Sequence, residues 1–150
     1  MAGQLRVLGD LYQRVLVPET VIYEVSGAGA GRVGAEEVVS SSWLERIPAG
    51  PSLEPLLAKE LGPGEAAVTS AAHHLGARLV LIDERRGRRI AEQAYGLRVK
   101  GTAGVLVLAK RAGLISAVRP CLEAMRSGGY YLSQRLFERA LEEAGETSPT

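Results

Sequence analysis

Short apolar segments recur along this chain, and each is separated from the next by a segment with helical spacing. Residues 15–17, 79–82 and 97–99 are rich in Val, Leu and Ile, and residues 43–47 alternate apolar and polar side chains as an edge strand does. Strands that are joined through helices need crossover connections, and these produce a parallel sheet with helices on both faces. We therefore predict an α/β fold built on a parallel sheet.

Helices are expected where apolar residues recur every three or four positions or where helix-starting residues precede such a pattern. The expected helices cover residues 4–13, 19–25, 35–42, 53–61, 65–75, 85–95, 102–111, 118–126 and 133–144. Pro18 suits the first turn of the second of these helices. Residues 27–34 hold four glycines and are expected to form a loop. We predict a single domain over residues 1–145, followed by a flexible tail over residues 146–150.

The composition excludes several classes of protein. With 150 residues, 46% of them hydrophobic and 23% charged, the chain suits a soluble globular domain. Because 18 basic residues face 17 acidic ones, a uniformly basic coat for nucleic acid is excluded, although a local basic patch is not. The single cysteine, Cys121, excludes an internal disulfide and a cysteine-rich zinc site. No apolar run reaches the roughly 18 residues of a membrane span and no signal peptide opens the chain, so a cytoplasmic location is expected.

Two acidic residues are predicted to meet at one edge of the sheet. Asp83 directly follows the strand 79–82, and ligands of open parallel sheets bind beyond the carboxyl ends of the strands. The helices 53–61 and 65–75 are consecutive, so the second runs antiparallel to the strand that it precedes. Its first residue, Glu65, is therefore expected at the carboxyl end of that strand, beside Asp83.

A third acid points to a metal ion. Glu24 follows the strand 15–17 by about two helical turns, which is close enough to lean over the same edge. Three converging carboxylates repel one another, and oxygen-only ligands favour Mg²⁺ or Mn²⁺. Such ions chiefly serve phosphate chemistry. Arg85 and Arg86, which are followed closely by two further arginines, are placed to contact the phosphates of a polynucleotide.

Each of these residues also has a purely structural interpretation. Glu65 suits the start of a helix because of the helix dipole, Asp83 suits an N-cap, and Glu24 taken alone is an ordinary surface acid. An arginine cluster is commonly a solvated helix face. The adjacent His73 and His74 do not share a face, so no metal role is expected for them.

Four segments together resemble PIN-domain proteins, in particular the PIN-like branch of predicted nucleic-acid-binding proteins. They read VLVPETVIYEV, LGPGEAAVTSAAHHLGARLVLIDERRGRRIA, GLRVKGTAGVLVLAKRAGLI and RPCLEAMRSGGYYLSQRLFERALEEAG. The resemblance covers almost the whole chain. It implies a three-layer α/β/α fold and a metal-dependent endoribonuclease for single-stranded RNA. Many such proteins are the toxin of a VapC-type toxin–antitoxin pair, so an antitoxin protein is an expected partner.

The resemblance also assigns roles to individual residues. Glu24, Glu65 and Asp83 match the acids that hold Mg²⁺ or Mn²⁺ and support catalysis in PIN domains. Thr102 matches a polar residue near the same edge, and with Arg85 and Arg86 it is expected to contact the substrate.

The chain departs from the family pattern at its start. Relatives begin with an apolar strand that ends in an aspartate, roughly VVSDSSPLIAL, whereas this chain opens Met1-Ala2-Gly3. Either the start is truncated or the protein lacks this strand, and we expect the first central strand to be missing from the sheet. Its absence would leave two exposed strand edges, which favours a homodimer. It would also weaken the metal site, so the alternative function is a catalytically impaired module that binds nucleic acid or protein.

Overall fold

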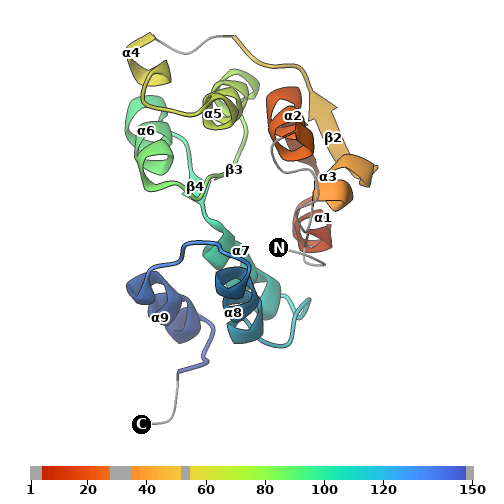
Figure 1. The fold of residues 1–150 in the computed structure, drawn as a ribbon, viewed down its shortest axis with the longest axis vertical. Helices are drawn as coiled ribbons and strands as arrows, with labels where there is room; N and C mark the ends of the chain where they lie inside the picture. Colours follow the sequence, from red (N-terminus) through yellow and green to blue (C-terminus); the bar gives the residue numbers. More distant parts are fainter. Residues whose placement is uncertain (1–4, 28–34, 52–54, 148–150) are drawn as a thin grey trace. The chain divides into compact units, whose positions relative to one another are not determined.

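The computed structural model describes residues 5–27, 35–51 and 55–147 (Figure 1). Contacts divide the chain into two compact units, each with its own set of elements. The first, called the sheet unit, spans Arg14–Gly101, and the second, called the helical unit, combines Gly3–Gln13 with Thr102–Thr150. The expectation of a single domain over residues 1–145 stays a prediction.

The sheet unit carries all the described strands. In chain order its elements are β1 (Val15–Pro18), α2 (Glu19–Gly27), α3 (Ala35–Ser40), β2 (Leu44–Ile47), α4 (Pro55–Ala58), α5 (Pro63–Leu75), β3 (Val80–Leu81), α6 (Arg85–Tyr95) and β4 (Val99–Lys100). The helical unit contains α1 (Arg6–Leu11), α7 (Thr102–Arg111), α8 (Arg119–Ser127) and α9 (Gln134–Glu143). None of the described helices is long and apolar enough to cross a membrane.

The strands form two small parallel sheets in place of one continuous sheet. Strand β1 pairs with β2, with Val15 opposite Leu44, and β3 pairs with β4, with Val80 opposite Val99. No described strand joins the two pairs, although helix α5 packs against both β1 and β3. The structure thus confirms a mixed α/β fold with parallel pairing, and it is mostly helical.

Several element boundaries differ from those expected. Pro18 ends strand β1 and does not enter the next helix. Helix α5 begins at Pro63, two residues earlier than predicted, because proline at the first helical position has a favourable backbone angle and Gly62 supplies an extended N-cap. Helix α4 ends at Ala58, three residues earlier than predicted, and its predicted first residues lie outside the described residues. The residues of the expected 27–34 loop after Gly27 also lie outside them.

Each unit has its own apolar core. In the sheet unit the core contains Ala72 of α5, Val80 of β3, Ile82 just after β3 and Ala91 of α6, each less than a tenth exposed. The core of the helical unit contains Ala103, Leu106, Val107, Val118, Leu122, Leu132, Phe137, Ala140 and Leu141. Burial of these apolar side chains determines which faces of α5 and α6 pack into the core. Polar side chains can then occupy the remaining faces and the helix ends.

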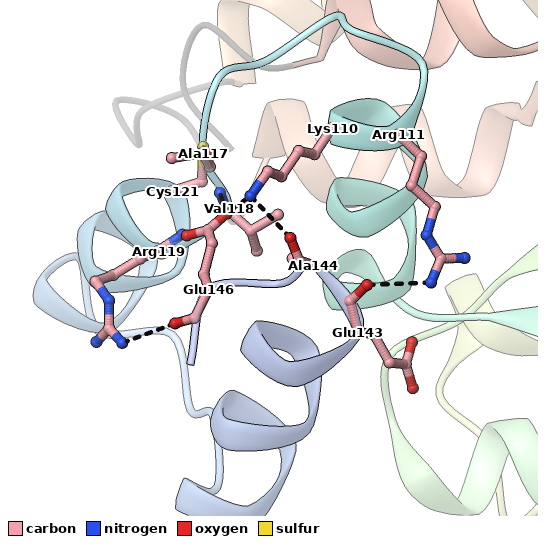
Figure 2. Close-up of polar contacts among 9 residues, drawn as sticks. All are labelled: Lys110, Arg111, Ala117, Val118, Arg119, Cys121, Glu143, Ala144 and Glu146. Carbon is pink, nitrogen blue, oxygen red and sulfur yellow. Dashed lines mark hydrogen bonds and ion pairs between the residues drawn. The ribbon is translucent and has the colours of Figure 1, made fainter. Parts of the chain in front are cut away.

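The last described segment is bound to the start of α8 through Glu146, the residue with which we expect the tail to begin (Figure 2). Its carboxylate accepts the backbone N–H of Val118 at 2.6 Å and of Arg119 at 3.0 Å, and it pairs with Lys110 Nζ at 2.9 Å. Lys110 Nζ also donates to the carbonyl of Ala144 at 2.8 Å. The side chain of Glu146 is only 14% exposed, so it caps α8 from a sheltered position.

Glu146→Gln is expected to destabilise the protein at neutral pH. Burial alone would raise the pKa of Glu146, but hydrogen bonds from Val118, Lys110 and Arg119 lower it below its ordinary value of 4.5. Charged hydrogen bonds of this kind are each worth about 1.5–3 kcal/mol, so the variant should unfold at a lower temperature at pH 7. Because the folded-state pKa is depressed, this stabilisation is lost as the pH falls below 4.5.

Thermal unfolding followed by circular dichroism at pH 7 and at pH 3.5 tests this expectation. The matched control is Glu142→Gln, because Glu142 is an exposed residue of α9. A melting temperature for Glu146→Gln equal to that of the control at pH 7 would contradict the capping role.

Candidate functional site

The first acid of the candidate site binds the start of a neighbouring helix. Glu24, on α2, accepts the backbone N–H of Gly64 through Oε1 at 2.9 Å, which satisfies one of the free N–H groups at the beginning of α5. A Cβ atom on Gly64 would overlap Glu24 Oε2, so only glycine allows this approach. The contact holds Glu24 next to the residue that follows Gly64, which is Glu65.

Glu65 in turn lies over the start of α6. A Cβ atom on Gly87 would lie 2.7 Å from Glu65 Oε2 and 3.2 Å from Ile82 Cγ2, so a second glycine makes room for a second carboxylate. The same Gly87 donates its backbone N–H to Glu84 at 2.9 Å, and Arg86 donates its own at 3.1 Å. Glu84 is therefore the N-cap of α6 and lies beside Glu65.

The carboxylates of Glu65 and Glu84 share one electrostatic environment. Burial, the charge of Glu84, a hydrogen bond with it and the charge of Glu24 all raise the pKa of Glu65. The pKa of Glu84 is lowered, mainly by the N–H groups of Gly87 and Arg86. Glu65 is therefore the member of the pair that takes up a proton first, and once protonated it can donate to Glu84.

Asp83 and the arginines occupy neighbouring positions. The atoms nearest to a Cβ built on Gly101 are Asp83 Oδ1, at 2.9 Å, and Arg88 Nη1, at 3.5 Å. Asp83 thus lies just beyond β3 and against the residue that follows β4. Arg85 and Arg86 are exposed in the first turn of α6.

The contacts join Glu24 to the start of α5 and Glu65 to Glu84, whereas Asp83 lies against Gly101. Thr102 begins α7 and belongs to the helical unit, so its predicted role stays a prediction. The sequence interpretation missed Glu84 and considered Asp83 as the cap. The signal was available, because a helix expected to start at Arg85 has residue 84 at its N-cap position.

The donor atoms suit a hard divalent cation, because every acid of the site offers carboxylate oxygen and Glu65 is crowded by like charge. The arrangement is nevertheless not a finished ligand set. Within residues 5–27, 35–51 and 55–147, no three acidic, histidine or cysteine side chains are grouped closely enough to hold one ion. The carboxylates that Mg²⁺ or Mn²⁺ prefers are therefore present as pairs of acids, and no three of the described acids surround a single point.

Comparison with known protein families identifies the family of this chain. Residues 1–146 match the family DUF3368, described as a PIN domain. No curated protein and no solved structure matches the chain.

Glu65→Gln is expected to raise the melting temperature at pH 7.5. The folded state binds a proton at Glu65 more tightly than the unfolded chain, so the ionised side chain costs stability once the pH exceeds the raised pKa. Removing that cost should add about 2–4 °C for each kcal/mol of repulsion relieved. The gain should vanish below the ordinary pKa of 4.5, where both states are protonated. Glu60→Gln, at an exposed position, is the control, and a lower melting temperature at pH 7.5 would contradict the repulsion.

Gly64→Ala is expected to displace Glu24 from α5. The added methyl group would overlap Glu24 Oε2, whereas Gly62→Ala meets no atom within 4 Å. Any rise in melting temperature that added Mn²⁺ produces in the wild type should therefore shrink in Gly64→Ala and persist in Gly62→Ala. An equal Mn²⁺ response in both variants would show that the position of Glu24 does not matter for the ion.

Proposed function

Because this chain belongs to the DUF3368 family of PIN domains, over residues 1–146, we propose that it is a Mg²⁺- or Mn²⁺-dependent endoribonuclease for single-stranded RNA. The observation that carries the proposal is the pairing of Glu65 with Glu84 while Glu24 holds the adjacent N–H of Gly64. These contacts bring acids from three helices to neighbouring positions, namely Glu24 of α2, Glu65 in the first turn of α5 and Glu84 at the N-cap of α6. A purely structural role for Glu65 would not require it to face another carboxylate.

Each residue has a defined task in this proposal. Glu24, Glu65, Asp83 and Glu84 would supply the carboxylates for the ion, although no three of the described side chains surround a single point in this structure. The ion would supply activation of water and would offset the charge of the phosphate under attack. A bound cation would lower the raised pKa of Glu65, so ion binding would be linked to the protonation of this carboxyl group. Arg85 and Arg86 are exposed next to the cap of α6 and would bind the phosphates on either side of the cleavage point.

The family resemblance also suggests wider biological roles. A toxin paired with an antitoxin protein is one such role, and Arg85 and Arg86 would suit contact with an acidic segment of that partner. A homodimer is the expected assembly. Strands β1 and β3 each have one paired edge and one that no described strand occupies, and such edges favour pairing with another chain.

The absence of a three-ligand group within the described residues favours a second function, a module that binds nucleic acid without cleaving it. Binding would then depend on the arginines and not on the acids. RNA binding that persists in EDTA without any cleavage would support this function over the first.

Asp83→Asn is expected to lower the rate of RNA cleavage in Mn²⁺ by at least about tenfold, because it removes an anionic oxygen from the metal environment. Glu84→Gln should have a similar effect, whereas Glu92→Gln, at an exposed position elsewhere on α6, should not. A fluorescent single-stranded RNA resolved on a denaturing gel gives the rates. Equal cleavage by the wild type and Asp83→Asn, or none by the wild type, would refute the ribonuclease function for this chain.

A further inference from the structure

One tyrosine of the helical unit is almost entirely exposed to solvent. Tyr131, on the loop that joins α8 to α9, is 87% exposed, while its neighbour Leu132 is buried. A single exposed aromatic ring is ordinary on a protein surface. Here, however, the backbone on both sides of the tyrosine is held by hydrogen bonds and by a buried neighbour.

Hydrogen bonds fix the loop on both sides of the tyrosine. The N–H of Tyr130 donates to the carbonyl of Met125 at 3.0 Å, and Arg126 Nη2 donates to the carbonyl of Leu132 at 3.1 Å. Leu132 packs in the core of the helical unit beside Phe137. The backbone before and after Tyr131 is thus anchored, and binding a ligand on its ring would require little ordering of the loop.

The charges around this loop favour an anionic ligand. Arg126 lies over the ring of Phe137, 4.1 Å from its centre, and also donates to Gln134 at 3.2 Å. Within the described residues neither Arg126 nor the exposed Arg135 forms an ion pair with a carboxylate. Of the four acids on the flanking helices, the two nearest to the loop in sequence are otherwise engaged, Glu123 with Arg119 and Glu138 with Gln134.

We propose that Tyr131 is a stacking platform for one base of a single-stranded RNA, with Arg126 and Arg135 binding the adjoining phosphates. The choice of RNA as the ligand rests on the proposed function. An exposed ring offers the face on which any base stacks, and unneutralised arginines attract the backbone. An exposed aromatic ring on an anchored loop, with such arginines on the two flanking helices, matches the composition of a sequence-tolerant single-strand site.

Binding of a fluorescein-labelled oligouridylate, followed by anisotropy in EDTA so that no cleavage occurs, tests the platform. Tyr131→Ala should weaken binding by about fivefold or more, since one stacked base is worth about 1–3 kcal/mol. Tyr131→Phe should bind like the wild type, because it keeps the ring. Arg135→Gln should weaken binding and reduce the dependence of affinity on salt by about one ion. Tyr23→Ala removes a tyrosine that is 78% exposed in the sheet unit and should leave binding unchanged.

A second readout separates this proposal from the proposed function. Light-induced crosslinking of a 5-bromouridine RNA should label Tyr131. Unchanged binding in Tyr131→Ala, equal losses in Tyr131→Ala and Tyr131→Phe, or no binding by the wild type would each overturn the platform. If the platform fails while Mn²⁺-dependent cleavage is retained, the ribonuclease function stands. If binding depends on Tyr131 but no RNA is cleaved, the ribonuclease function fails and the platform stands.

Discussion

The arrangement of acids depends on a hydrogen bond between a backbone N–H and a carboxylate. Gly64 donates to Glu24 at the start of α5, and this hydrogen bond links α2 to α5. The next residue, Glu65, extends its side chain toward the start of α6. Gly87 has the same role at the start of α6, because its N–H donates to Glu84 and its lack of a side chain leaves room for Glu65. Two glycines at helix starts therefore allow three glutamates to approach one another without steric overlap, and the free N–H groups of those helices offset part of the negative charge.

The same arrangement explains why the acids are unequal. Glu84 is stabilised as an anion by two N–H groups, whereas Glu65 is partly buried and faces the charge of its neighbours. An added cation would offset the negative charges that help to raise the pKa of Glu65, so ion binding and the titration of this carboxyl group are linked. This property connects the local geometry to the proposed metal-dependent function.

Much of this could be predicted from the sequence. Helices α6 and α7 begin and end where their spacing indicates, and the parallel pairing of the short apolar segments follows from the helices between them. The division of the strands into two pairs could not be predicted from local pattern, since it depends on which edges meet in space. Connection lengths predict that Glu65 lies near Asp83, but such lengths have a precision of several residues. They could not distinguish Asp83 from Glu84 as the closer partner, which is decided by the N–H groups of Arg86 and Gly87.

The central claim is that Glu65 belongs to a cluster of carboxylates whose repulsion a divalent cation relieves. Nuclear magnetic resonance of the ¹³C-labelled Glu65 carboxyl group during a pH titration, with and without Mg²⁺, measures this most directly. We predict a pKa above the ordinary glutamate value without Mg²⁺ and a clear fall when Mg²⁺ is added. Titration at the ordinary value of 4.5, unchanged by Mg²⁺, would contradict the account.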